Sequence, residues 1–318
     1  MIASRKDTTR QRDALAHGAV AAIKELRTVA DMMRWCASRF NEYGLHFGHG
    51  TRDAVEESLA LVLHALNLHA PVAPEIFAAR LTRSEREQVA ALALERIRAR
   101  KPLPYLTGEA WFAGMAYHVD ERVLIPRSPL AEWIERGFEP FVDADAVRRV
   151  ADVGTGSGCL AIACAMAFPD AEVDAVDCSE EALEVAAQNV ARHGMAQRVR
   201  LLHGDLLEPC AGPYDIIVSN PPYVPQASFL ALPAEYAHEP ALALTAGSDG
   251  LDQVRRLLRQ APSRLRRDGI LVVEVGEAAP ALERAFPELA FTWLECERGG
   301  DGVFLLGAGQ LAAMRDDT

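Results

Sequence analysis

The sequence lacks the residue spacings typical of metal sites and the long apolar runs that cross membranes. Its cysteines form no Cys-x-x-Cys pair and have no histidine-rich partner segment, so no metal site is expected. No apolar run approaches the ~18 residues of a membrane span, and no amino-terminal stretch suits a signal peptide. We therefore expect a cytoplasmic location and no membrane partner. The oligomeric state stays unknown.

A surplus of basic residues is also absent. The chain has 33 Lys and Arg against 45 Asp and Glu, a net charge of −12 and a pI near 5.3. Proteins that grip bare nucleic acid normally present a basic face, so direct sequence-specific binding to nucleic acid is disfavoured. An acidic surface suits a basic protein partner, although the same charge also serves solubility.

A glycine-rich loop separates an apolar segment at residues 150–153 from an apolar helix predicted at 160–168. The loop reads Gly154-Thr155-Gly156-Ser157-Gly158. Glycines let the backbone approach a ligand closely, and the amides that open the helix can face a polar group. The spacing differs from the dinucleotide fingerprint Gly-x-Gly-x-x-Gly, and no Lys-Ser/Thr pair follows. A cofactor without phosphates is therefore predicted.

Acidic residues follow the next two predicted strands. Asp177 ends the strand at 172–176, about 20 residues beyond the glycine loop, where a carboxylate typically binds ribose hydroxyls. The alternative is that Asp177 only stabilises the start of the following helix. Asp205 follows the strand at 199–202, where it can accept a hydrogen bond from an adenine amino group or serve as an ordinary loop residue.

The tetrapeptide Asn220-Pro221-Pro222-Tyr223 follows an apolar run at residues 216–219 and indicates chemistry on a planar amino group. Such a nitrogen is a poor nucleophile because its lone pair is delocalised, so its N–H groups must be held. The Asn220 side-chain oxygen and the Pro221 carbonyl are acceptors, and the prolines have no donors of their own. The alternative is a turn at a strand end, since Asn-Pro and Pro-Pro are common turn dipeptides.

Together these motifs resemble the S-adenosylmethionine-dependent methyltransferases, and more closely the protein glutamine-N5 methyltransferases. The resemblance covers residues 28–311 and includes Leu124-Ile125-Pro126-Arg127, His238-Glu239-Pro240 and the segment 246–251. It implies an α/β fold: a Rossmann-like, mostly parallel sheet with one antiparallel edge strand, and a small amino-terminal helical domain. It also implies the cofactor S-adenosyl-L-methionine, bound by Asp152, Gly154, Thr155, Gly156, Gly158, Asp177, Asp205, Leu206 and Asn220.

Two branches of this family are close, one acting on the Gly-Gly-Gln loop of release factors and the other on large-subunit ribosomal protein L-three. The segments 32–41, 47–51, 235–240 and 299–304 look like the ribosomal-protein branch. Leu206 agrees, because the release-factor branch often carries a tryptophan there that covers adenine. We therefore expect methylation of a glutamine in the basic protein L-three. The release-factor activity, a nucleic-acid adenine methyltransferase and a non-catalytic ribosome-assembly factor are the alternatives.

The resemblance also implies the roles of individual residues. Catalysis is assigned to Asn220, Pro221, Pro222 and Tyr223, and substrate contact to Arg127, Tyr223, Glu235 and His238. Pairing with a nearby carboxylate such as Glu132 is the alternative for Arg127. For His238, a hydrogen-bonded loop histidine is favoured over a general base, because the cationic N-methyl product is acidic enough to lose its proton unaided.

Helical periodicity is expected at residues 14–41, 56–68 and 83–100, the last with Ser84 as N-cap. Later strands are expected at 270–275, 291–295 and 302–306, and a short hairpin around Trp111 and Tyr117. The expected organisation is a disordered tail (1–13), a helical substrate-docking domain (14–105), a hairpin linker (106–125), the methyltransferase domain (126–311) and a tail (312–318).

Overall fold

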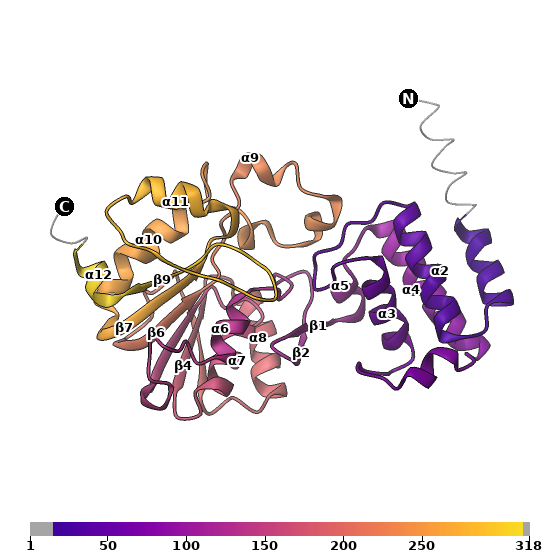
Figure 1. The fold of residues 1–318 in the computed structure, drawn as a ribbon, viewed down its shortest axis with the longest axis horizontal. Coiled ribbons are helices and arrows are strands. Elements are labelled where there is room, and N and C mark those ends of the chain that lie inside the picture. Colours follow the sequence, from indigo (N-terminus) through magenta and orange to yellow (C-terminus); the bar gives the residue numbers. More distant parts are fainter. Residues whose placement is uncertain (1–14, 314–318) are drawn as a thin grey trace. The chain divides into compact units, whose positions relative to one another are not determined.

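The computed structural model describes residues 15–313 and divides into two compact units (Figure 1). The first unit runs to Gly108 and also includes Pro233–His238, a short segment from much later in the chain. The second unit comprises Glu109–Leu232 and the chain from Glu239 onward. The predicted amino-terminal tail, and all but residues 312 and 313 of the predicted carboxyl-terminal tail, lie outside the described residues.

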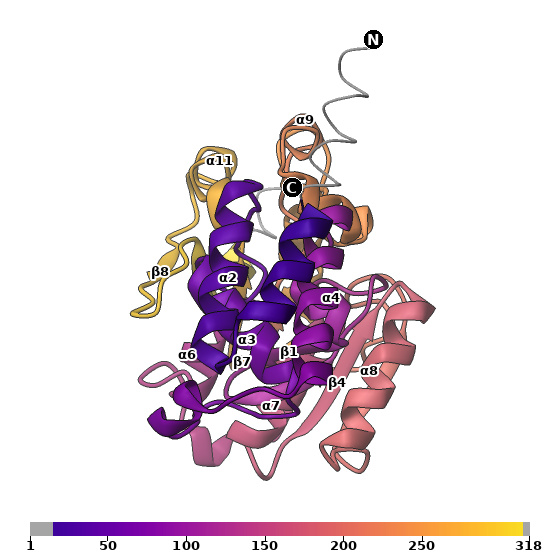
Figure 2. The same ribbon diagram turned by 90° about the vertical axis from the view of Figure 1, so that its right-hand side faces the viewer.

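The first unit is helical. Its elements are a helix at residues 15–25, α2 (Val29–Glu42), α3 (Ala54–Ala65), the short 3-10 helix η1 (Pro74–Ala78), α4 (Arg83–Ala99) and α5 (Leu103–Thr107). Figure 2 shows α2, α3 and α4 packed together. Met32, Phe40, Leu61 and Val89 are fully buried between them, so the unit has its own hydrophobic core.

The helical period at residues 14–41 favours one continuous helix, and this prediction is wrong: the structure has two helices, and the second begins after Thr28. The Thr28 hydroxyl accepts from the Asp31 amide at 3.1 Å, and the Asp31 carboxylate accepts from the Thr28 amide at 3.0 Å. This reciprocal capping box begins a new helix, because it satisfies amide donors that a continuous helix would use internally. Ser84 is likewise not a cap. Thr82 caps α4, in a capping box with Glu85.

The second unit is built on a seven-stranded sheet with the order β5-β4-β3-β6-β7-β9-β8. The strands are β3 (Arg149–Val153), β4 (Glu172–Asp177), β5 (Val199–His203), β6 (Tyr214–Ser219), β7 (Leu265–Glu274), β8 (Thr292–Leu294) and β9 (Val303–Gly307). All neighbouring pairs from β5 to β7 are parallel, which confirms the predicted fold class. The antiparallel strand is not at the edge: β9 lies between β7 and β8, because the chain reaches the edge in β8 before it turns back.

Helices cover both faces of this sheet (Figure 1). One face carries α6 (Leu130–Glu135), α7 (Cys159–Ala167) and α8 (Glu180–Arg192); the other carries α10 (Asp252–Gln260), α11 (Ala279–Ala285) and α12 (Ala308–Ala313). Successive residues of β6 alternate between these layers: Ile216 and Val218 pack on the first, Ile217 on the second. Within residues 15–313, no helix combines the length and apolarity needed to cross a membrane.

The predicted hairpin is confirmed. It consists of β1 (Glu109–Phe112) and β2 (Met115–His118), paired antiparallel around Ala113 and Gly114, which both have positive φ. By its contacts the hairpin belongs to the second unit, where Phe112 and Tyr117 are buried in the core.

The connection from β6 to β7 contains α9 (Gln226–Phe229) and the 3-10 helices η3 (Ala234–His238) and η4 (Ala241–Ala243). Of these, η3 lies in the segment that belongs to the first unit.

Candidate active site

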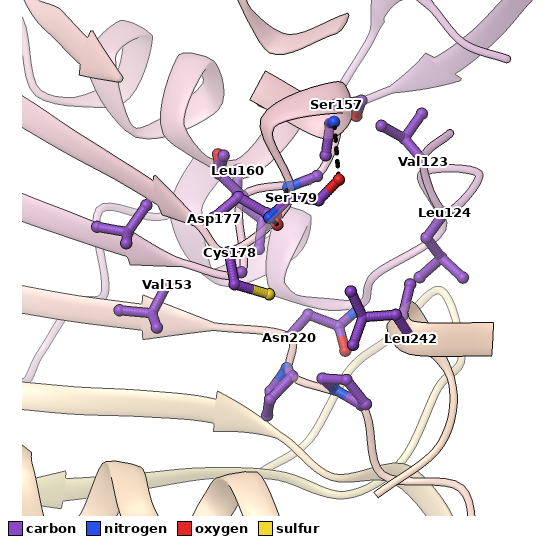
Figure 3. Close-up of a pocket in the computed structure, with 18 of the residues that line it drawn as sticks. Val123, Leu124, Val153, Ser157, Leu160, Asp177, Cys178, Ser179, Asn220 and Leu242 are labelled. Atoms are coloured by element: carbon purple, nitrogen blue, oxygen red, sulfur yellow. Dashed lines mark hydrogen bonds between the residues drawn. The ribbon is translucent and has the colours of Figure 1, made fainter. Parts of the chain in front are cut away.

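A pocket opens in the second unit at the carboxyl ends of β3, β4 and β6, where ligands of open α/β sheets collect (Figure 3). The predicted site residues that line it are Arg127, Gly154, Thr155, Gly156, Asp177, Asp205, Leu206, Asn220, Pro221 and Pro222. Separate parts of the chain thus bring most of the proposed site to one cavity. The exceptions are Asp152, Gly158, Tyr223, Glu235 and His238.

The glycine loop forms one wall of the pocket. The amides of Gly154 and Thr155 both donate to the Val176 carbonyl at 2.9 Å, which draws the loop over the end of β4. Gly154 (φ +76°) and Gly156 (φ +53°) leave open space: a Cβ on either would meet nothing within 4 Å. Gly158 has another role, because a Cβ there would lie 3.3 Å from the Ala186 Cβ of α8. Two glycines therefore leave room for a ligand, and the third allows close helix packing.

Asp152 lies fully buried behind this loop. Its Oδ2 accepts from the Thr155 hydroxyl at 2.6 Å and from the Ala161 amide at 3.0 Å, so it joins the loop to the start of α7. Its Oδ1 is buried with no hydrogen-bond partner in the described part of the chain. Burial raises the pKa of Asp152 to about 7. Asp152 shapes the pocket without lining it.

Asp177 both organises the loop and faces the pocket. Its two oxygens accept from the Gly156 amide at 2.8 Å and the Ser179 amide at 2.9 Å. Burial raises the pKa of this carboxyl above its ordinary value. Each carboxylate oxygen has two lone pairs, so acceptor capacity remains for a ligand. The two interpretations of Asp177 from the sequence are therefore compatible.

Asp205 and Leu206 line the pocket beyond the end of β5. The Asp205 carboxylate is paired with Arg256 of α10 at 2.5 Å. Leu206 adopts φ +50°, unusual for a branched residue, and its side chain packs partly against the core. This part of the wall is thus apolar beside one carboxylate.

Asn220, Pro221 and Pro222 line the opposite wall, and Figure 3 shows Asn220 beside Leu242. Their position is set by strand pairing: Ser219 pairs with Val153, and its hydroxyl donates to the Val153 carbonyl at 2.7 Å. Tyr223 does not line the pocket; its hydroxyl donates to Glu274 at 2.8 Å.

Arg127 lines the pocket but is clamped by a carboxylate. Its two terminal nitrogens donate to the two oxygens of Glu239 at 2.6 and 2.7 Å. The nearby Glu132 accepts instead from the amides of Glu297 and Arg298, so it is not the partner. A carboxylate 112 residues away thus takes the place of the neighbour in sequence.

Glu235 and His238 belong to the first unit. Glu235 is fully buried and accepts from the His46 amide at 3.0 Å and from Arg96 and Arg100 at 3.3 and 3.1 Å. Burial alone would raise its pKa, but these donors hold the pKa below its ordinary value. The ring of His238 hydrogen-bonds to the Ala99 carbonyl at 2.9 Å. These residues fix the segment 233–238 within the helical unit.

The sequence motifs did not predict several other residues of the site. Asn189 of α8, fully buried, donates to the Ser157 carbonyl at 2.8 Å and binds both the amide and the carbonyl of His118. Leu242, Cys178 and Gln253 line the pocket. No motif distinguishes these positions, because each is recruited by the fold rather than by a local pattern.

Known proteins resemble this chain over most of its length. Residues 139–237 match the family model "Methyltransferase small domain". The chain is 49% identical over 290 residues to the ribosomal protein uL3 glutamine methyltransferase of Bordetella pertussis, covering 91% of this chain and 97% of that protein. It is also 49% identical to the enzyme of the same name from Xanthomonas campestris, covering 92% and 95%.

The chain belongs to the family of uL3 glutamine methyltransferases. Its predicted enzyme class, a protein glutamine methyltransferase, is confirmed. Among solved structures it is similar to a ribosomal protein L11 methylase from Lactobacillus delbrueckii, at 26% identity and a TM-score of 0.39, covering 56% of this chain and 75% of that one.

The pocket fits S-adenosylmethionine better than a phosphate-bearing cofactor. Gly154 and Gly156 leave space at the loop, Asp177 offers acceptors for hydroxyl groups, and Leu206 gives an apolar contact for a flat base. The two arginines that line the pocket are already paired, Arg127 with Glu239 and Arg122 with Asp120 and Glu184. Between residues 15 and 313, no group of three or more His, Cys, Asp and Glu is placed to hold a metal ion.

Proposed function

We propose that this protein transfers the methyl group of S-adenosylmethionine to the side-chain amide nitrogen of a glutamine in ribosomal protein uL3, the large-subunit protein L-three. The observation that carries the proposal is the meeting of Asn220, Pro221 and Pro222 with the glycine loop around one pocket. Enzymes that share about half of this sequence over nearly its whole length are named for this reaction.

When bound, the cofactor supplies a methyl group already activated by its positive sulfur. The protein's task is then to hold the glutamine amide. The Asn220 side-chain oxygen and the Pro221 carbonyl accept its two N–H groups, which turns the nitrogen lone pair toward the methyl group. Alignment of this kind is worth on the order of 7 to 11 kcal/mol in oriented reactions. Asp177 and Leu206 hold the ribose and adenine, with Asp205 near the adenine amino group.

The substrate assignment agrees with charge. The net charge of −12 suits a basic ribosomal protein and disfavours a bare nucleic acid. This counts against an adenine methyltransferase, and a formed pocket with Asn220 on its wall counts against a non-catalytic assembly factor. The proposal includes a cytoplasmic location, where ribosomal proteins are made. The release-factor reaction remains the nearest alternative.

The test is a methyl-transfer assay with labelled cofactor and three acceptors side by side: uL3, a release factor and an adenine-containing oligonucleotide. We expect label on uL3, at a glutamine identified by mass spectrometry. Asn220→Ala should lower kcat at least 100-fold with little change in cofactor affinity. Transfer to either other acceptor but not to uL3, or near-full activity of Asn220→Ala, would overturn the assignment.

A further inference from the structure

A buried carboxylate at the end of β7 has no part in the reaction described above. Glu274 is the last residue of β7 and is only 6% exposed. Its Oε1 accepts from the Tyr223 hydroxyl at 2.8 Å, and its Oε2 accepts from the Ser128 hydroxyl at 2.5 Å. No salt bridge reaches Glu274 from any residue between 15 and 313.

Such an arrangement costs stability. A buried carboxylate paired only with neutral hydroxyls is poorly compensated for lost hydration. Burial accordingly raises the pKa of Glu274, against the two hydrogen bonds and the nearby Arg127 charge. The two hydrogen bonds of Glu274 therefore indicate a role in holding the residues that donate them.

The partner of Glu274 points to that role, since Tyr223 ends the tetrapeptide that carries Asn220. The leading end of the tetrapeptide is fixed by Ser219 on β6, as described above. Tyr223 fixes the trailing end, and the next residue continues the support: the Val224 amide donates to the Leu244 carbonyl at 2.8 Å. Residues 220–222, which line the pocket, are therefore held from both sides.

Tyr223 lies against glycines with both its ring and its backbone carbonyl. Its ring lies against Gly276, where a Cβ would come within 2.8 Å of the ring. Its carbonyl lies against Gly250, where a Cβ would clash with the carbonyl oxygen. Tyr223 is also partly buried against the core of the second unit, and the hydrogen bond from its hydroxyl to Glu274 anchors the far end of the side chain.

We propose that Glu274 is a positioning residue: by holding the Tyr223 hydroxyl, it fixes the tetrapeptide so that the acceptors on Asn220 and Pro221 meet the glutamine amide. This inference rests on the proposed function. Glu274 does not line the pocket; its partner Ser128 does, and its partner Tyr223 is the one that continues into the tetrapeptide. Its contribution therefore belongs to turnover and to recognition of the protein substrate, not to cofactor binding.

The experiment compares Glu274→Ala, Glu274→Gln and Tyr223→Phe in the uL3 methylation assay, with the wild type in the same run. Glu274→Ala should lower kcat/KM for uL3 about 10-fold or more, with cofactor Kd changed less than 2-fold. Glu274→Gln should restore most of the activity, because its amide oxygen still accepts from Tyr223 and its NH2 donates to Ser128. Tyr223→Phe should match Glu274→Ala, and the double variant should be no worse than either single one.

The matched control is Glu132→Ala, another buried carboxylate of the same unit, bonded to two backbone amides and not lining the pocket. It should lower thermal stability without lowering kcat/KM of the folded enzyme. Full activity of Glu274→Ala, additive losses in the double variant, or an equal loss in Glu132→Ala would overturn the positioning role. An inactive wild type would instead count against the proposed function, so the two failures are distinguishable.

Discussion

Replacing Asp152 with asparagine should remove a large part of the pH dependence of stability in the second unit. Burial raises the pKa of Asp152 from an ordinary value of 3.8 to about 7 in the folded protein. The folded state therefore binds this proton more tightly than the unfolded state. The stabilisation from that proton is complete below the unfolded-state pKa and is lost as the pH rises through about 7.

The magnitude follows from the two pKa values. At 1.36 kcal/mol for each pH unit between them, ionising the buried carboxylate costs about 4 kcal/mol in total. Between pH 5 and pH 8, the free energy of unfolding should fall by roughly 2 to 3 kcal/mol through Asp152 alone. An asparagine side chain at this position would not titrate, and its amide oxygen can still accept from Thr155 and Ala161. The Asp152→Asn variant should therefore lack this fall.

The assay is urea unfolding of cofactor-free protein from pH 5 to pH 8. Hydrogen-exchange pulses on peptides from β3 and β6 report the second unit separately from the helical one. Asp170→Asn, which changes an exposed carboxylate of the same unit, controls for the loss of one acidic group. Parallel pH profiles for wild type and Asp152→Asn, offset or not, would refute the reasoning. A constant offset alone would mean that Asp152 is not titrating in this range.

Two further predictions concern the glycine loop and the helical unit. Gly154→Val should weaken cofactor binding at least 10-fold, because the valine side chain enters the space left at the loop; isothermal titration measures this. The control is Gly194→Val. Gly194 has a similar positive φ and equally open surroundings but lies outside the pocket, so this variant should not weaken binding. Glu235→Ala should destabilise the first unit by about 3 kcal/mol, because it leaves the fully buried Arg96 with one carboxylate partner instead of two. Hydrogen exchange of the α4 amides measures this change. Unchanged protection of these amides would contradict the prediction.

The strands and helices were predictable because each depends on a short pattern of neighbouring residues. Alternating and continuous apolar runs predicted the strands of the second unit to within a few residues, apart from the early start of β7. Thr28 and Asp31 form the Thr-x-x-Asp pattern of a capping box, which marks the break, but the apolar period continues across it and favours a single helix.

The hydrogen bonds and ion pairs between residues far apart in the sequence were not predictable, because no local pattern indicates which distant residues will pair. Proximity in sequence suggests Glu132, five residues away, as a partner of Arg127, whereas the structure pairs Arg127 with Glu239. The contact between Tyr223 and Glu274 spans 51 residues, and that between Ser128 and Glu274 spans 146. The motif at residues 238–240 supported the resemblance to the family. It did not predict that Glu239 would accept two hydrogen bonds from Arg127 within the second unit. Sequence motifs indicated where the site lies, and the fold decided which of their residues reach the pocket.

The described lining of the pocket contains no histidine, and its acidic side chains at the strand ends are already engaged. Asp177 accepts from two backbone amides, and Asp205 is paired with Arg256. Both carboxylates are thus held by donors of the protein itself. The reaction proposed here needs no free base, because the cationic product loses its proton readily, so the rate must come from positioning. Supports outside the pocket then matter for the rate, and this is the role proposed for Glu274, which does not line the pocket but holds the end of the tetrapeptide that does.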